Sequence, residues 1–282
     1  IASCLVGSEM CIRDRYSPPQ VNRKLEVNLW WITAVLIAMN VGLYGWQVLS
    51  GVDATSPTTA DAIRWGADFS PLTFLEQPQR LFTSMFFHFG LVHLMLNMWA
   101  LYIFGSIAEQ MLGRFYFIGL YLLAGLMGSL LSSYVTIRDS YALLEHFDPT
   151  LLPHVGAGAS GAVMGLGAAL TILALLPALP DQRFILDKKS LVMVMAINLA
   201  FGFMATGINN AAHIGGMIMG ALLAMTWYIS QKIHQANLGA VVGLIIGAVL
   251  CALFYQYCVS LIPPIEPLWQ EILAQMKSQL GI

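Results

Sequence analysis

Four polar residues stand inside long apolar stretches of the sequence, where they could form a catalytic site. They are Ser160, His213, His93 and Asn97. A polar side chain at membrane depth is costly, so such a residue usually has a partner or a function. A serine hydroxyl becomes a nucleophile when an imidazole takes its proton, and amide or imidazole N–H groups can stabilise the oxyanion that forms. Three separate segments therefore supply residue types that suit acyl transfer.

The predicted chemistry is that of a serine hydrolase. Ser160 begins its apolar stretch, where unpaired backbone N–H groups and the positive end of a helix dipole favour negative charge. His213 could take the serine proton. His93 and Asn97 are four residues apart, share a helix face and could donate hydrogen bonds to the oxyanion. The stretches with the serine and its base hold no Asp or Glu, so the sequence predicts a Ser–His dyad and not a Ser–His–Asp triad.

Glycines recur four residues apart in the two stretches that carry the dyad. One pair is Gly161 and Gly165, and the other is Gly216 and Gly220, which shares a helix face with His213. Small residues at this spacing allow two membrane helices to approach closely. We therefore expect close backbone contact to bring the serine hydroxyl within reach of the imidazole.

The elements that position these residues are membrane spans, to judge by composition. The chain has 282 residues, of which 13 are Lys or Arg and 15 are Asp or Glu. Charged residues make up 10%, against about 25% in soluble proteins, and hydrophobic residues make up 58%. A soluble fold of this size would need more charge to cover its surface, so we predict an all-α polytopic membrane protein. The net charge of −2 excludes an electrostatic footprint for nucleic acid.

Seven stretches are long and apolar enough to cross about 30 Å of hydrocarbon as helices. They are 28–49, 91–111, 115–136, 159–177, 190–208, 211–230 and 238–260. The polar residues lie in the second, fourth and sixth stretches, which all run in the same direction across the membrane. Each polar group lies in the first third of its span, so we expect all four at a similar depth near one face.

The basic residues of the short connections predict the orientation. With the amino terminus in the cytoplasm, seven basic residues face the inside and four face the outside. The candidate site then lies towards the outer face. We expect a multi-pass protein of a bacterial inner membrane.

The chain is expected to divide into four parts. Residues 1–15 have no periodicity and no signal-peptide layout, and we interpret them as an artefactual leader, followed by a cytoplasmic segment at 16–27. Residues 28–230 form a six-helix core. Its longest connection, 51–90, is too apolar for a free loop and too broken by proline to span, so we expect it in the membrane interface. Residues 231–282 form a seventh span and a tail.

The cysteines predict neither a disulfide framework nor a zinc site, because none has metal-ligand neighbours. They are Cys4, Cys11, Cys251 and Cys258. His88 and His93, five residues apart, do not share a helix face well enough to form a metal pair. We expect no metal and no cofactor.

Together these segments resemble the rhomboid family of intramembrane serine proteases. The family's G-x-S-G serine element appears here as Gly158-Ala159-Ser160-Gly161, and its H-x-x-x-N pair as His93 and Asn97. The family's histidine near the start of the sixth helix appears as His213, and His88 matches a further family histidine. The matches cover roughly residues 79–220 in the right order and spacing.

The resemblance implies a rhomboid-like six-helix core plus one C-terminal transmembrane helix. It implies Ser160 as the nucleophile, His213 as the general base, and an oxyanion hole formed by Asn97, His93 and the Ser160 backbone N–H. Structural support would come from Gly158, Gly161, His88, Gly216 and Gly220. The sequence departs from the family at two positions. Gln79 stands where a tryptophan often precedes the arginine, and Met164 stands where an aromatic residue commonly stacks on the catalytic histidine.

The predicted function is hydrolysis of peptide bonds in or near the transmembrane segments of other membrane proteins. The expected partners are these substrates and the lipid bilayer, with no nucleic acid and no particular oligomeric state. A catalytically silent rhomboid-like protein that binds membrane clients is one alternative, against which the presence of both Ser160 and His213 argues. A proton or solute transporter is another, but the chain shows no obvious repeat between its halves and no carboxylate near the site.

Overall fold

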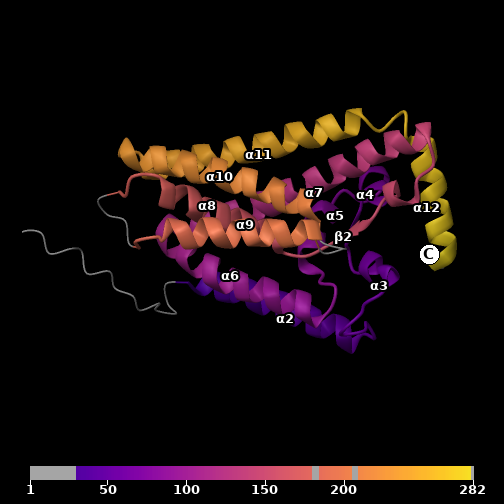
Figure 1. Ribbon diagram of the computed structural model, residues 1–282, viewed down its shortest axis with the longest axis horizontal. Coiled ribbons are helices and arrows are strands. Elements are labelled where there is room, and N and C mark those ends of the chain that lie inside the picture. Colours follow the sequence, from indigo (N-terminus) through magenta and orange to yellow (C-terminus); the bar gives the residue numbers. More distant parts are fainter. Residues whose placement is uncertain (1–29, 180–183, 205–208, 281–282) are drawn as a thin grey trace, which may run out of the picture.

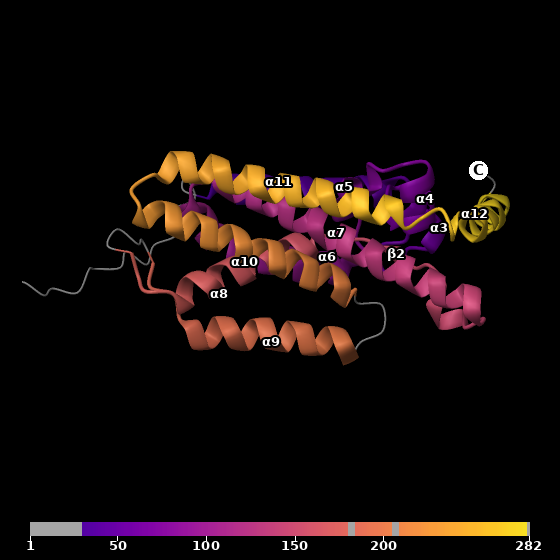
Figure 2. The same cartoon turned by 90° about the horizontal axis from the view of Figure 1, so that it is seen from above.

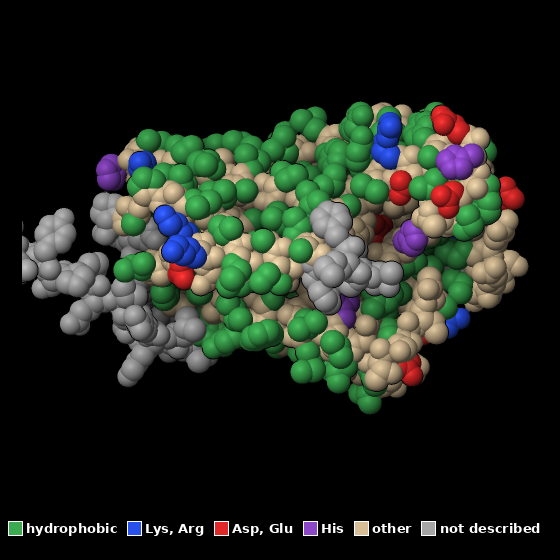
Figure 3. Space-filling view, viewed as in Figure 1, with side chains coloured by type: hydrophobic (Ala, Val, Ile, Leu, Met, Phe, Trp, Pro, Cys, Tyr) green, Lys and Arg blue, Asp and Glu red, His purple; other side chains and the backbone are tan. Residues whose placement is uncertain are grey.

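The computed structural model describes residues 30–179, 184–204 and 209–280. The predictions for 1–15 and 16–27 lie outside the described residues. Long helices run side by side along the longest axis of the molecule, and one further helix crosses their end (Figure 1). The face shown in Figure 3 has hydrophobic side chains across its middle and most of its charged side chains near its two ends. This distribution is typical of a protein that crosses a bilayer.

Helices occupy all seven of the predicted stretches. They are α2 (Trp31–Leu49), α6 (Leu91–Leu112), α7 (Arg114–Glu145), α8 (Ser160–Leu175), α9 (Lys188–Met204), α10 (Asn210–Lys232) and α11 (Ala236–Ser260). Among the described residues, five of them are long and apolar enough to cross a membrane unaided: α2, α6, α7, α10 and α11. The expectation of an all-α polytopic fold with a six-helix core and one additional C-terminal span is confirmed.

The short helix α8 occupies the centre of the bundle. It contacts α6, α7, α9 and α10, and 11 of its 16 residues are buried. Figure 2 shows α9 on one side of this group and α11 on the other. A 16-residue helix is about 24 Å long, shorter than the hydrocarbon layer. Helix α8 begins level with the start of α10, since Gly161 lies against Ala212, and well before the end of α7, since Gly161 also lies against Gly128.

The connection between α2 and α6 is folded against the bundle. It contains α3 (Thr59–Arg64), β1 (Asp68–Phe69), α4 (Ser70–Leu75), α5 (Arg80–Thr83) and the 3₁₀ turn η2 (Ser84–Phe86). Strand β1 pairs antiparallel with β2 (Val155–Gly156), which follows the 3₁₀ turn η3 (Pro149–Leu151) and leads into α8. The sequence did not predict this pairing. The expected interfacial position of 51–90 stays a prediction.

Two buried charged side chains hold this connection together. The Arg80 guanidinium donates to the backbone carbonyl oxygens of Ile63 and Ala67, each at 2.8 Å. The Asp68 carboxylate accepts from the Thr73 hydroxyl and, at 3.1 Å, from the Ser133 hydroxyl of α7. Burial raises the pKa of Asp68 to about 6, although these hydrogen bonds and the nearby Arg80 act in the opposite direction. Strand β1 is therefore tied to α4 and to α7 through one carboxyl group.

The C-terminal part contains a helix where we expected only a tail. Helix α12 (Glu266–Leu280) follows a turn after α11 and crosses the end of the bundle next to α4 (Figure 1). Helix α7 also continues nine residues beyond the predicted span end at 136, to Glu145. Its additional turns provide the surface on which α12 packs, since Ile137 of α7 and Trp269 of α12 share one buried cluster.

Candidate active site

Ser160 is the first residue of α8, and contacts from the 51–90 connection fix the chain just before it. Strand β2 pairs with β1, and the Gly158 N–H donates to the carbonyl oxygen of Ser84 at 2.9 Å. Ser160 itself is half-buried. Its position in the first turn leaves its backbone N–H without an acceptor in its own helix, as an oxyanion donor requires.

Gly158 brings the serine segment into contact with His93. Its φ of +118° lies in a region that side-chain-bearing residues rarely adopt. A Cβ atom at this position would also lie 2.8 Å from Cε1 and 2.9 Å from Nε2 of His93. Both the backbone conformation and the available space therefore require glycine here.

His93 is oriented by a hydrogen bond on its other nitrogen. Its Nδ1 accepts from the backbone N–H of Phe89 at 3.2 Å, so a neutral ring carries its proton on Nε2, the atom near Gly158. Asn97, one turn further along α6, is buried and donates from Nδ2 to the His93 carbonyl oxygen at 2.9 Å. The Asn97 amide group has a second N–H, which that bond leaves available.

His88 packs against His93 from outside α6. The ring centroids are 5.2 Å apart in an edge-to-face arrangement, and His88 is 1% exposed. Burial, with a contribution from His93, lowers the pKa of His88 to about 3. A neutral His88 supports His93 without adding positive charge.

His213 lies in the first turn of α10, which Asn209 caps. The Asn209 side-chain oxygen accepts from the Ala212 N–H at 3.0 Å, and its amide nitrogen donates to the Ser132 hydroxyl of α7. The His213 ring is buried, and its Nδ1 has no hydrogen-bond partner among the described residues. Asn209 was not among the predicted site residues, although an asparagine directly before an apolar helix is a usual N-cap signal.

The glycine pairs bring α8 and α10 into backbone contact. A Cβ atom on Gly216 would lie 1.9 Å from the carbonyl oxygen of Gly161, and one on Gly220 would lie 2.0 Å from that of Gly165. The prediction of close approach at these four glycines is confirmed. Figure 1 shows the two helices side by side along their length.

The same contact brings the starts of the two helices together. The carbonyl oxygen of Ala212, the residue before His213, would lie 3.3 Å from a Cβ atom on Gly161, the residue after Ser160. Gly128 of α7 meets both helices here, because its Cβ would lie 2.6 Å from the same oxygen and 3.4 Å from the Gly161 Cα. Gly128 was not among the predicted site residues, because its only signal in the sequence is that of a small residue in an apolar stretch.

The structure thus brings together the predicted residues from α6, α8 and α10. The serine segment lies against α6 at His93 and against α10 at Ala212. Met164 is buried one turn after Ser160, whereas Gln79 is exposed at the start of α5. Across the described residues, no three His, Cys, Asp or Glu side chains are grouped to hold a metal ion. The arrangement presents a hydroxyl, an imidazole and several N–H donors, which suits acyl transfer.

Comparison with known proteins gives a family for this arrangement. The model of the Rhomboid domain matches residues 75–232. The Rhomboid protease AarA of Providencia stuartii is 27% identical over 278 residues, which is 93% of this chain and 98% of that protein. The Rhomboid protease GluP of Bacillus subtilis (strain 168) is 31% identical over 195 residues, or 68% of this chain and 34% of that protein. RHOMBOID-like protein 1 of Arabidopsis thaliana is 32% identical over 208 residues, or 73% of this chain and 49% of that protein.

Proposed function

This chain belongs to the rhomboid family of intramembrane serine endopeptidases, and on that premise we propose that it uses a Ser160–His213 dyad to cleave other membrane proteins. The bond cleaved lies in or near a transmembrane segment of the substrate. The observation that carries the proposal is the backbone contact between α8 and α10, which places the two residues on facing helix starts. A hydroxyl and an imidazole on two membrane helices can meet only where the backbones approach this closely.

In the first half of the reaction, the Ser160 hydroxyl oxygen attacks the substrate carbonyl carbon while the imidazole of His213 takes the hydroxyl proton. The carbonyl oxygen becomes negatively charged. Asn97, the Nε2–H of His93 and the backbone N–H of Ser160 donate hydrogen bonds to it. The protonated His213 then gives its proton to the leaving amine, which breaks the peptide bond and leaves an acyl-enzyme.

In the second half, water attacks the acyl carbon. His213 accepts a proton from that water and returns one to the Ser160 oxygen as the ester bond breaks. One water molecule is consumed, and a carboxylic acid and an amine are formed, which become a carboxylate and an ammonium group as the proton passes from one to the other. Because α8 starts well before the end of α7 and Ser160 is only half-buried, we propose that water reaches Ser160 from the end of the bundle where the 51–90 connection lies.

We place this end of the bundle at the outer face of a bacterial inner membrane, with the amino terminus in the cytoplasm. The support is the asymmetry of basic residues in the short loops. A substrate helix must unwind locally to expose its backbone to Ser160, because helical carbonyl groups are already hydrogen-bonded.

The test is cleavage of a model single-span substrate by the purified protein in liposomes. We expect cleavage by the wild type, none by Ser160→Ala or His213→Ala, and labelling of Ser160 by a serine-directed fluorophosphonate. His146→Ala, at an exposed position directly after α7, is the matched control and should cleave like the wild type. Cleavage that persisted in Ser160→Ala would overturn the proposal, and client binding without any product from the wild type would favour the catalytically silent alternative.

A further inference from the structure

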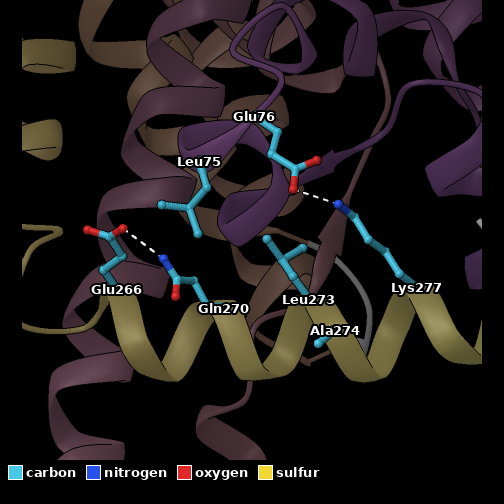
Figure 4. A pocket seen from close by; sticks show the side chains of 7 residues that line it. All are labelled: Leu75, Glu76, Glu266, Gln270, Leu273, Ala274 and Lys277. Carbon is cyan, nitrogen blue, oxygen red and sulfur yellow. Dashed lines mark hydrogen bonds and ion pairs between the residues drawn. The ribbon is translucent and has the colours of Figure 1, made fainter.

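Helix α12 has no role in the proposed chemistry, yet it is held firmly at the site end of the molecule. Figure 4 shows its Leu273 and Lys277 directed towards α4, where Lys277 pairs with Glu76 at 2.6 Å. The residues of both helices line a cavity of about 420 Å³. The contacts of α12 show which parts of the molecule it holds in place.

One end of α12 is anchored on the extended part of α7. Trp269 is fully buried, and its Nε1 donates to the Ser140 hydroxyl of α7 at 2.9 Å. The Tyr141 hydroxyl of α7 donates to the carbonyl oxygen of Leu261, directly after α11 in the turn that leads to α12, at 2.7 Å. The Trp269 ring also lies 6.4 Å from that of Phe74 in α4. Helix α12 therefore has a rigid support on one side and the 51–90 connection on the other.

The middle of α12 joins the buried cluster of the strand that precedes Ser160. Leu273 is 4% exposed and belongs to a buried cluster with Ile63 of α3, Phe69 of β1 and Leu72 of α4. Val155 of β2 packs against the same cluster. Phe69 and Val155 are also directly paired across the two strands. Through Leu273, α12 thus belongs to the same buried cluster as both strands of the pair.

We propose that α12 is a clamp that presses β1 against β2 and so sets the position of the catalytic serine, with Leu273 as its positioning residue. Ser160 follows Val155 by only five positions, and the Gly158 N–H bond to Ser84 lies between them. Release of the cluster would loosen the strand pair, and the start of α8 would move relative to His93 and His213. The expected change in catalytic rate rests on the proposed function, whereas the expected loosening of the strand pair does not.

The test compares Leu273→Ala with Gln279→Ala, an exposed position on the same helix, in the full-length protein. Leu273→Ala should make the backbone amides of 155–160 exchange faster with deuterium. It should also lower kcat and the rate of fluorophosphonate labelling by roughly tenfold or more, while KM changes less than twofold, because the reacting groups and not the substrate contacts are displaced. Leu273→Met should restore both rates, since it conserves volume. Gln279→Ala should match the wild type.

A second pair of variants covers the case in which Leu273→Ala does not fold. Lys277→Glu places two carboxylates together at an exposed site and should speed exchange at 155–160, and the double reversal with Glu76→Lys should slow it again. The clamp is wrong if exchange at 155–160 is unchanged in folded Leu273→Ala or in Lys277→Glu. If instead Ser160→Ala still cleaves substrate, the proposed dyad fails, while the exchange measurements still decide the clamp.

Discussion

Replacing Gly216 with alanine should separate α8 from α10 and slow catalysis without unfolding the protein. The added Cβ would lie 1.9 Å from the carbonyl oxygen of Gly161 and 2.7 Å from its carbonyl carbon. A carbon–oxygen contact needs about 3.3 Å, so the two backbones must part by roughly 1.4 Å. No flexible side chain can give way instead, because the obstructing atoms are backbone atoms.

That movement acts directly on the proposed Ser160–His213 dyad. Ser160 is next to Gly161, and His213 is one turn before Gly216. A hydrogen bond of about 2.8 Å that lengthens by more than 1 Å no longer transfers a proton efficiently. Misplacement of reacting groups by about 1 Å costs on the order of 100-fold in rate, or about 2.7 kcal/mol of barrier. We therefore expect kcat to fall by about 10- to 100-fold.

The assay is the initial rate of cleavage of a single-span substrate in liposomes, together with circular dichroism and thermal unfolding. Gly42→Ala is the matched control, because Gly42 lies in the transmembrane helix α2 and a Cβ there would meet nothing within 4 Å. The control should retain the wild-type rate. A folded Gly216→Ala protein with more than half of the wild-type kcat would refute the idea that this contact sets the catalytic geometry.

Substitutions at three further positions test other parts of the structure. Because burial raises the pKa of Asp68 from 3.8 to about 6, its contribution to stability is complete below the lower value and is lost as pH rises through the higher one. The unfolding temperature of the wild type relative to Asp68→Asn should therefore fall between about pH 4 and pH 7, and a constant difference would contradict this. Asn209→Ala removes the cap of α10 and should cost about 1 kcal/mol in thermal unfolding, whereas Asn209→Ser should cost much less. Gly158→Ala forces a side chain into a φ of +118° and against His93, so fluorophosphonate labelling of Ser160 should slow at least tenfold. Unchanged labelling would show that this contact is dispensable.

The helices and their pairing could be predicted because they depend on local properties of the sequence. A membrane span is an uninterrupted apolar run, and hydropathy alone located α2 and α11 within a few residues. The contact of α8 with α10 follows from glycines spaced four apart, since that spacing places them on one face of a helix. Roles in catalysis for Ser160 and His213 stay predictions, which the cleavage and labelling measurements test.

The missed features have weak or non-local signals. Strands β1 and β2 have two residues each, too few to show an alternating pattern, and their partners are far apart in sequence. Asp68 had the sequence context of an ordinary loop carboxylate, and only the folded chain shows that it is buried. Helix α12 did have a signal, because Ile265, Trp269 and Leu273 recur every four residues in a polar segment. This amphipathic pattern is missed when only stretches long enough to cross a membrane are considered.

The position of α12 in the sequence has a consequence for biosynthesis. The ion pair between Glu76 and Lys277 joins residues that are 201 positions apart, and the cluster around Leu273 likewise forms only once α12 is present. During translation α2 and α6 to α11 leave the ribosome before α12 does, so the nascent chain holds Ser160 and His213 before the contacts of α12 can form. Contacts of such long sequence separation also form late in folding, because of the chain entropy they cost. The contacts of α12 at the site end of the molecule therefore form after the bundle, and a chain that stopped before residue 266 would hold Ser160 and His213 without the contacts of α12.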